Sequence, residues 1–294
     1  MLVGFDGTWI DTSPKPGTRP SNVRRFGECY SGDYIYEAGI GNDDDHAFIM
    51  QMWAGATGWG GRGIVRDACM KVGALVEQGK KALLDVVGFS RGSALALHFA
   101  NTVTEHGVPL PSTMKKVVRW VRNPNGKGRR RKTKYVYQMY PVDIRWLGLW
   151  DLVPAMGIPG NDINIGYQLD APPDAIIHHA MALDEPRKTF QVKRVKDAEE
   201  VWFMGAHSEV GGGWGNERLS DCTLRWMIAR AQKAGLEVDI DILNLPSPQP
   251  MGLPKSKTGH ERSRRQVKPG DKVHRTVKQA YYPSIPWEKV VITS

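Results

Sequence analysis

A serine flanked by glycines, in the motif Gly88-Phe89-Ser90-Arg91-Gly92, is the segment of this 294-residue chain best suited to chemistry. An apolar run at residues 82–87 precedes the motif, and a stretch rich in Ala and Leu at residues 91–103 follows it. This context predicts a strand, a tight turn and a helix, which together project the serine hydroxyl above the end of a sheet. The alternative interpretation is a glycine-rich turn that only packs a helix on a sheet.

A serine nucleophile requires a base that accepts its proton and a carboxylate that orients this base. The apolar segment 145–150 leads directly into Asp151, and the apolar segment 201–204 leads into a glycine-rich loop that contains His207. Both residues therefore follow predicted buried strands, at the sheet edge where the turn at Ser90 also opens. We predict Ser90 as the nucleophile, His207 as the base and Asp151 as the orienting acid.

The other histidines are weaker candidates for the base. His98 falls inside the predicted helix after the serine turn, where packing is the simpler interpretation. His178 and His179 could line a pocket, but a hydrogen-bonded polar pair is the favoured interpretation. The remaining four lie in loops or in the basic C-terminal segment: His46, His106, His260 and His274. His207 is preferred because it lies just past a strand, in a loop that can turn toward the sheet edge.

The oxyanion that develops on an attacked carbonyl requires backbone N–H donors. The amide of Arg91 is one candidate, because it follows the serine and opens the predicted helix. The loop after the first predicted strand contains Asp6, Gly7 and Thr8, and its glycine allows close backbone approach. We predict the amides of Gly7 and Thr8 as second donors. Asp6 is expected to hold this loop in place, with direct contact to Ser90 or a substrate as the alternative.

Near-continuous apolar runs predict strands that are buried on both faces, at residues 2–5, 83–89, 144–150 and 201–204. Apolar spacing and end signals predict helices at residues 64–76, at residues 91–105 before Gly107, and from Ser220 to Gly235. Strands that alternate with helices favour an α/β fold, with a mostly parallel sheet flanked by helices. We expect one such domain to occupy residues 1–294.

The formal net charge of +9 is concentrated in two segments. Residues 115–134 hold ten Lys and Arg and no acid, and residues 254–278 hold nine against two acids. We interpret residues 123–134 as an exposed basic loop. Residues 245–294 are interpreted as an irregular basic extension, because proline is frequent there and apolar periodicity is weak. These segments are either solvated loops or a docking surface for an anionic membrane, with nucleic acid the less favoured partner.

Composition excludes several classes of protein. No apolar run reaches about 18 residues, which argues against a transmembrane helix. The strand-like start at residues 1–5 leaves no room for a signal peptide, so we expect a cytoplasmic product, compatible with delivery by a signal-less secretion route. Three widely spaced cysteines predict no disulfide framework. We expect no metal or organic cofactor, and we interpret the acidic residues 43–45 as a solvated loop rather than a cation site.

The chain resembles the DUF2235 family of α/β-hydrolases, typified by the catalytic domain of type VI secretion phospholipase effectors. The matching segments occur in family order within residues 1–240: Phe5–Trp9, Gly39–Gly41, Gly88–Gly92, Leu147–Val153, Ala182–Arg187 and Trp202–Gly213. The resemblance implies a catalytic triad on Ser90, Asp151 and His207, and ester hydrolysis on lipids of the phospholipase A type. The chain departs from the family pattern at Leu152, Glu209 and Trp214, where the family has Thr, Asp and Tyr.

Together these observations predict a serine hydrolase of the α/β-hydrolase fold that cleaves carboxylic esters of lipids. Asp184 and Glu209, in the matching segments, are expected to support the pocket or its loops. Two alternatives remain open. One is a thioesterase or acyltransferase with the same triad, since leaving-group preference depends on pocket shape. The other is a catalytically idle protein that binds nucleic acid or an anionic surface through its basic segments.

Overall fold

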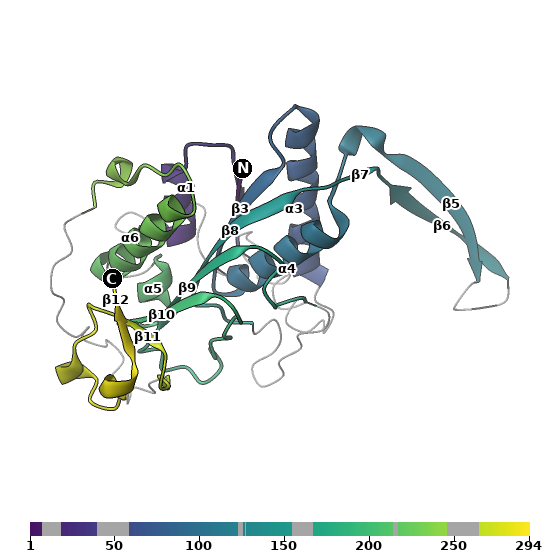
Figure 1. Ribbon diagram of the computed structural model, residues 1–294. Coiled ribbons are helices and arrows are strands. Elements are labelled where there is room, and N and C mark those ends of the chain that lie inside the picture. The colour runs from purple at the N-terminus through teal and green to yellow at the C-terminus, as the bar shows by residue number, and fades with distance from the viewer. Residues whose placement is uncertain are drawn as a thin grey trace.

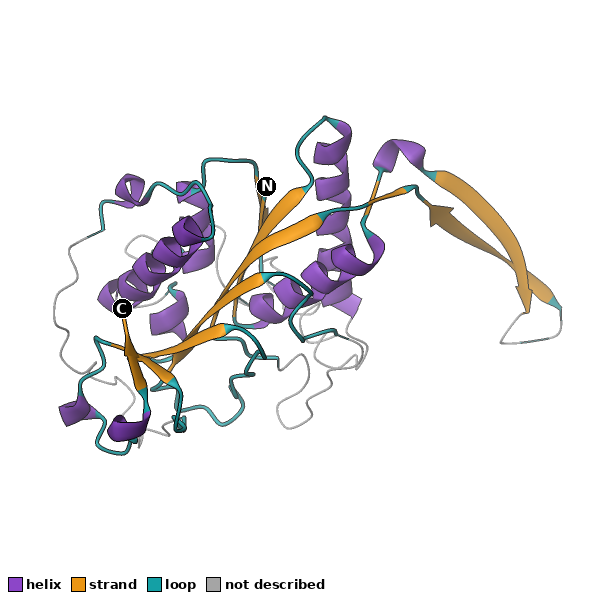
Figure 2. Cartoon of the chain, viewed as in Figure 1, coloured by secondary structure: helices purple, strands orange, loops and turns teal. Residues whose placement is uncertain are grey.

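The computed structural model describes residues 1–7, 19–39, 59–122, 126, 128–154, 167–213, 217–245 and 265–294 (Figure 1). Within these ranges the centre of the fold is an eight-stranded sheet, in which all neighbouring strands are parallel. Helices cover both faces of this sheet (Figure 2). The predicted α/β-hydrolase-like class, a mostly parallel sheet flanked by helices, is confirmed.

The strands run across the sheet in the order β2-β1-β3-β8-β9-β10-β11-β12. Their bounds are β1 Leu2–Phe5, β2 Tyr34–Glu37, β3 Leu83–Phe89, β8 Asp143–Trp150, β9 Ile176–Ala182, β10 Glu199–Phe203, β11 Lys272–His274 and β12 Val291–Thr293. The four predicted strands correspond to β1, β3, β8 and β10, whose ends lie within two residues of the predicted ones. The other four strands were not predicted.

Helices α3 (Trp59–Glu77) and α4 (Arg91–His106) pack on one face of the sheet, and α1 (Asn22–Cys29) and α6 (Glu217–Lys233) pack on the other. Successive residues of a strand point to opposite faces, so Val86 joins the core under α4 while Val87 joins the core under α6. Burial on both faces explains why β3 reads as a continuous apolar run in the sequence.

The basic segment 115–136 forms a hairpin, so the prediction of a loop at residues 123–134 was wrong for its second half. Strand β5 (Lys115–Arg122) pairs antiparallel with β6 (Arg129–Val136). A shorter pair, β4 (Val108–Pro109) with β7 (Met139–Tyr140), joins the hairpin to the body. Five of the eight residues of β6 are cations, and the strand therefore lacks the apolar alternation by which a strand is recognised.

The C-terminal segment is less irregular than expected. Strands β11 and β12 extend the main sheet beyond β10, and Tyr282 and Ile285 pack in a buried cluster with Trp202. The C-terminal segment is thus part of the main body rather than a covering over it.

The described chain also contains short 3-10 helices, which are η1 Pro111–Thr113, η2 Ile240–Leu243, η3 Gln279–Tyr281 and η4 Trp287–Lys289.

Because the strands of the sheet are parallel, their carboxyl ends lie along one edge. The turn after β3, the turn after β8 and the short helix α5 (His207–Gly211) after β10 all lie at this edge. None of the helices in the described part of the chain has both the length and the apolar character that crossing a membrane requires.

Candidate active site

Ser90 lies on a sharp turn between β3 and α4. Its backbone has φ 60° and ψ −125°, in the region that favours glycine. Its N–H donates to the carbonyl of Trp150 at the end of β8, at 3.0 Å. A Cβ atom at Gly92 would lie 2.1 Å from the Phe5 carbonyl oxygen, so only glycine permits this approach of α4 to β1. The turn therefore holds the Ser90 hydroxyl in a strained position at the carboxyl edge of the sheet.

Three side chains from three different turns form one hydrogen-bonded chain. His207 Nε2 lies 2.7 Å from Ser90 Oγ, and His207 Nδ1 lies 2.6 Å from Asp151 Oδ2. All three residues are buried. An ionised carboxylate can only accept a hydrogen bond, so Nδ1 carries the proton and Nε2 is left to accept from the Ser90 hydroxyl. This is the tautomer that a general base requires.

Two aromatic rings and one carboxylate hold His207 in place. The ring centroids of Phe89 and Phe190 lie 4.7 Å and 5.0 Å from that of the imidazole. The backbone N–H of His207 donates to Glu185 Oε2 at 3.2 Å, and Glu185 is paired with Arg187 at 2.5 Å. These contacts restrict the ring so that each nitrogen faces its partner.

Asp151 follows β8 with φ 41° and has no exposed surface. Its Oδ1 accepts from the Ala182 N–H at 2.9 Å and from Arg265 Nη1. Arg265 also donates to the carbonyls of Ala182 at 3.1 Å and Phe190 at 2.5 Å. Burial on its own would raise the pKa of Asp151, but the Arg265 guanidinium and the hydrogen bond with His207 outweigh burial and hold this pKa well below its usual range.

Arg265 is the main site residue that the sequence analysis missed. In the sequence it is one of nine cations within residues 254–278, and no motif distinguishes it from the others. In the structure its side chain is only 8% exposed, and its backbone N–H donates to the Leu183 carbonyl just after β9. Glu185 and Phe190 were missed as well, because their roles depend on where the loop after β9 folds.

A second buried network supports the turn that contains Asp151. His179 Nε2 accepts from the Leu152 N–H at 3.0 Å, and His179 Nδ1 lies 3.0 Å from Glu200 Oε1. Glu200 is also paired with Arg194. Both ring nitrogens of His179 are therefore occupied by structural partners, and this histidine is not available as a second base.

Asp184 and Glu209 both hold the loop between β10 and α5. Asp184 Oδ2 accepts from the Gly205 N–H at 2.8 Å and from the Tyr282 hydroxyl at 2.6 Å. Glu209 Oε2 accepts from the Ala206 N–H at 2.8 Å, and burial raises the pKa of Glu209. The two carboxylates thus fix the loop from which the candidate base projects.

The carboxylate of Asp6 is engaged within the loop after β1. Its Oδ1 accepts from the Gly7 N–H at 2.7 Å, and its Oδ2 accepts from the hydroxyls of Ser21 and Tyr36. Burial raises the pKa of Asp6. The Gly7 N–H, which we predicted as an oxyanion donor, is therefore already used by Asp6 in this structure.

The amide of Arg91 is differently placed. It opens α4 directly after Ser90, and amides of a first helical turn have no acceptor within the helix. The prediction of the Arg91 amide as an oxyanion donor is therefore compatible with its position. The Arg91 side chain forms no ion pair in the described part of the chain, and burial lowers its pKa to about 10.

Several predicted features fall elsewhere. Thr8 and the acidic residues 43–45 lie outside the described residues. Within the described ranges, no three His, Cys, Asp or Glu side chains are placed to share a metal ion. Cys29, Cys69 and Cys222 carry free thiols, and burial raises the pKa of the first two to about 12.

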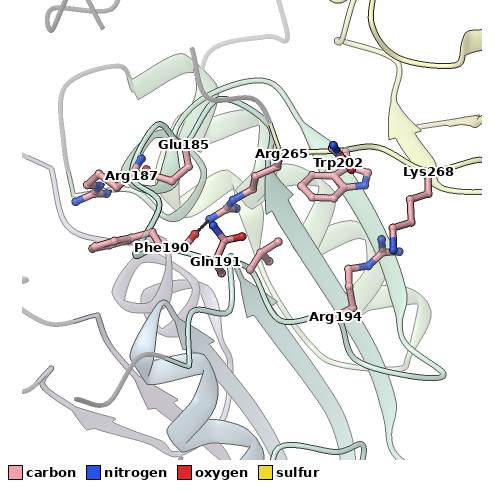
Figure 3. Close-up of a pocket in the computed structure, with 10 residues that line it drawn as sticks. Glu185, Arg187, Phe190, Gln191, Arg194, Trp202, Arg265 and Lys268 are labelled. Carbon is pink, nitrogen blue, oxygen red and sulfur yellow. Dashed lines mark hydrogen bonds and ion pairs between the residues drawn. The ribbon is translucent and has the colours of Figure 1, made fainter. Parts of the chain in front are cut away.

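A cavity of about 360 Å³ opens beside Arg265 (Figure 3). Its lining consists of Glu185, Arg187, Phe190, Gln191, Val192, Arg194, Trp202, Arg265, Gln266 and Lys268. Four of these side chains are cations and one is an acid. Figure 3 shows Arg265 near the centre of the group. Arg265 contacts Asp151, and Phe190 contacts His207. The cavity therefore adjoins the buried hydrogen-bonded chain of Ser90, His207 and Asp151.

Residues 1–230 match the family model for the Tle1-like phospholipase effector catalytic domain of type VI secretion systems. The match covers 230 of the 294 residues, including the turns that carry Ser90, Asp151 and His207. The chain belongs to this family. The resemblance noted in the sequence is thereby confirmed. Arg265 lies beyond the matched residues.

Proteins similar to this chain include the following two. The uncharacterized protein YEL023C of Saccharomyces cerevisiae is 50% identical over 46 residues, which cover 14% of this chain and 7% of that protein. A crystal structure of an uncharacterized protein from Pseudomonas aeruginosa aligns with 82% of this chain and 46% of its own, with a TM-score of 0.50 and 20% identity. The chain spans less than half the length of either protein. The second match supports the shared fold.

Proposed function

We propose that this Tle1-like protein hydrolyses carboxylic esters of lipids through a serine nucleophile. The observation that carries the proposal is the hydrogen-bonded chain of Ser90, His207 and Asp151, with contacts of 2.7 Å and 2.6 Å. A serine hydroxyl is a weak nucleophile at neutral pH, and an adjacent imidazole oriented by a carboxylate activates it. Membership of a phospholipase effector family supports a lipid as the substrate.

In the first half of the proposed reaction, Ser90 Oγ attacks the acyl carbonyl carbon and its proton passes to His207 Nε2. Asp151 stabilises the resulting imidazolium. The negative charge on the carbonyl oxygen is met by the amide of Arg91. The bond to the alcohol then breaks, His207 returns the proton to the departing oxygen, and the acyl group remains on Ser90.

In the second half, a water molecule takes the place of the alcohol. His207 accepts a proton from this water as it attacks the acyl carbonyl carbon, and a second tetrahedral intermediate forms. When the bond to Ser90 breaks, His207 returns the proton to Oγ and the fatty acid leaves. The enzyme is then restored, with one ester bond and one water consumed.

The cavity beside the proposed site supports a substrate with an anionic headgroup. Arg187, Arg194, Arg265 and Lys268 line it. The three arginines pair with carboxylates of the chain, whereas Lys268 has no such partner among the described residues. Lysine binds phosphate as a point charge, and aromatic side chains at the same cavity can contact the apolar glycerol and acyl carbons. Lys268 therefore supports a phospholipid ester over a neutral glyceride.

A fluorophosphonate probe tests the nucleophile directly. The parent chain should be labelled covalently, and Ser90→Ala should not be. Ser93→Ala is the matched control, because Ser93 lies in the first turn of α4, three residues after Ser90, and its hydroxyl donates to the Trp150 carbonyl. Absence of labelling in a folded parent chain would instead favour a non-catalytic binding protein.

Products released from a panel of phospholipids and neutral glycerides, identified by mass spectrometry, test the substrate class. Asp151→Asn and His207→Ala should each lose most of the activity on every hydrolysed lipid, with the Asn change comparable or milder. Release of thiol or transfer of acyl groups, without fatty acid formation, would contradict ester hydrolysis while leaving the nucleophile in place.

A further inference from the structure

The hairpin of β5 and β6, residues 115–136, is here called the arm. Its described residues carry nine cations and no acid: Lys115, Lys116, Arg119, Arg122, Arg129, Arg130, Arg131, Lys132 and Lys134. None of the nine pairs with a carboxylate in the part of the chain that the structure describes. Figure 1 shows the arm extending away from the sheet and its helices. Its charge is therefore not compensated by the described part of the fold.

The arm also repels itself. Arg119 lies directly opposite Lys132, and Arg122 lies directly opposite Arg129. Like charges at such positions destabilise a strand pair, and a two-stranded hairpin without a covering layer is only marginally stable. A partner that supplies negative charge would remove this repulsion, so the arm is suited to an anionic surface.

The arginines and lysines of the arm are separated along its length. Among the described residues of the arm, the five arginines lie in the distal half, whereas three of the four lysines lie near the base. Directly opposite residues share a face, so Trp120 and Arg131 point to one side and Arg119 and Lys132 to the other. Both faces of the distal half therefore present guanidinium groups, which bind phosphate in a bidentate manner.

Exposed apolar side chains accompany these cations. Val118, Trp120 and Tyr135 share one face of the arm, and the Trp120 side chain is 64% exposed. Six of the ten exposed large apolar residues in the described ranges lie within residues 114–140. Trp and Tyr prefer the boundary between lipid headgroups and acyl chains. A nucleic-acid groove offers phosphates but no apolar layer for three such side chains, so a lipid surface fits better.

We propose that the arm inserts, distal half first, into the headgroup layer of an anionic membrane. In this arrangement the arginines bind lipid phosphates on both faces of the arm, and Trp120 reaches the interface. Strands β4 and β7 connect the arm to the main sheet at the amino ends of its strands. Docking of the arm on a membrane therefore leaves the opposite, carboxyl edge with Ser90 uncovered. The inference does not depend on the hydrolase proposed above.

The test measures binding of the full chain to vesicles of ether-linked phospholipids, which an ester hydrolase cannot cleave. Binding is thus measured separately from hydrolysis. Vesicles of phosphatidylglycerol mixed with phosphatidylcholine are compared with vesicles of phosphatidylcholine alone. The parent chain should float with the anionic vesicles and not with the neutral ones. Absence of binding to anionic vesicles would overturn the proposal.

Two triple variants with equal loss of charge locate the contact. Each Lys or Arg close to an anionic leaflet contributes about fivefold to affinity, so R129Q/R130Q/R131Q should bind roughly 100-fold more weakly. The matched control K115Q/K116Q/K134Q, near the base, should lose less than about tenfold, because charges farther than the Debye length of about 8 Å are screened. Equal losses in both variants would reduce the effect to net charge and overturn insertion of the distal half.

Trp120→Ser is an independent test, because the change removes the apolar contact of Trp120 and keeps every charge of the arm. It should weaken binding to anionic vesicles by about tenfold. A melting curve checks each variant, and these exposed positions should leave it unchanged. Duplex DNA is the competing ligand. Tight, salt-steep DNA binding that R129Q/R130Q/R131Q removes, with no vesicle binding, would overturn the lipid assignment in favour of nucleic acid.

Discussion

Replacing Arg265 by Met should destabilise the fold and impair ester hydrolysis together. The change keeps an apolar stem but removes the hydrogen bonds to Asp151 and to the carbonyls of Ala182 and Phe190. Asp151 would stay buried, with only the Ala182 N–H and His207 as donors to its carboxylate. Removal of one partner from a buried ion pair costs about 3–5 kcal/mol. Because two donors remain, we expect a loss of unfolding free energy of about 3 kcal/mol.

This loss should depend on pH in a defined direction. The folded-state pKa of Asp151 is depressed relative to its unfolded value of about 3.9. A depressed carboxyl pKa stabilises the fold above the unfolded pKa, and this contribution is lost as pH falls through the folded pKa. Without Arg265 the pKa of Asp151 rises. The difference between parent and variant should therefore be full near pH 7 and shrink below about pH 4, as measured by urea unfolding.

Turnover supplies the second measurement. Without the guanidinium, Asp151 can turn away from His207, and we expect kcat on a simple ester to fall about 10- to 100-fold, less than the roughly 10⁴-fold loss expected for a defective triad acid. Arg265→Lys should recover stability more than turnover, because one ammonium cannot hold a carboxylate and two carbonyls in the same geometry. Lys268→Met is the control, because it alters an exposed cation of the same cavity that pairs with no carboxylate among the described residues, and it should change stability by about 0.5 kcal/mol or less. Parental stability and parental kcat in Arg265→Met would refute the reasoning.

Other changes test the remaining parts of the structure. Ser90→Ala should lower kcat on an activated ester by about 10⁴-fold or more without changing the melting temperature, because the hydroxyl lies above the sheet and not in the core. Gly92→Ala should abolish the folded product, because its Cβ would lie 2.1 Å from a carbonyl oxygen of β1. Gly63→Ala in α3, whose Cβ would have no atom within 4 Å, should raise the free energy of unfolding by about 0.5–1 kcal/mol. Expression yield and melting temperature distinguish the two variants. Burial lowers the pKa of His178 and of His274 to about 4. Between about pH 6.5 and 4 these histidines therefore bind protons in the unfolded chain but not in the folded one, so the free energy of unfolding should decline as pH falls through this range. His274→Asn should flatten this decline, and a decline of equal slope in parent and variant would contradict the assignment.

The parts of the site that follow buried strands could be predicted from the sequence. A continuous apolar run marks such a strand, and the residue after it must lie at the carboxyl edge of a parallel sheet. Ser90, Asp151 and His207 each fit this rule, and the structure brings them within hydrogen-bond distance. Strands without such a run were missed. In β9 the His178-His179 pair interrupts the apolar run, although the strand itself is continuous. Strands β11 and β12 have only three residues each.

Contacts between loops could not be predicted in this way. Arg265 and Asp151 are 114 positions apart, and their contact depends on how the C-terminal segment folds against β9. No local pattern of charge or periodicity encodes such a contact, because one arginine of a basic segment resembles another. The same holds for the Gly7 N–H, since the sequence does not show that Asp6 accepts its hydrogen bond.

The residues beyond 230 belong to the same folded unit as the proposed site, although the family match ends at residue 230. Tyr282 packs in a buried cluster with Trp202, and its hydroxyl binds Asp184, which holds the loop before α5. Asp271 accepts from the Trp202 indole at 2.9 Å and pairs with Arg194. These contacts attach the C-terminal segment to β10 and to the loop after β9.

Attachment of this segment has a consequence for the chemistry. The segment places Arg265 in contact with Asp151, although the segment itself contains no member of the proposed triad. A chain that ended at residue 230 would retain Ser90, Asp151 and His207, but it would expose the Trp202 face of β10 and leave the buried carboxylate without its cation. The orientation of His207 depends on that carboxylate. We therefore expect the smallest active unit to include strands β11 and β12, which complete both the sheet and the support of the proposed site.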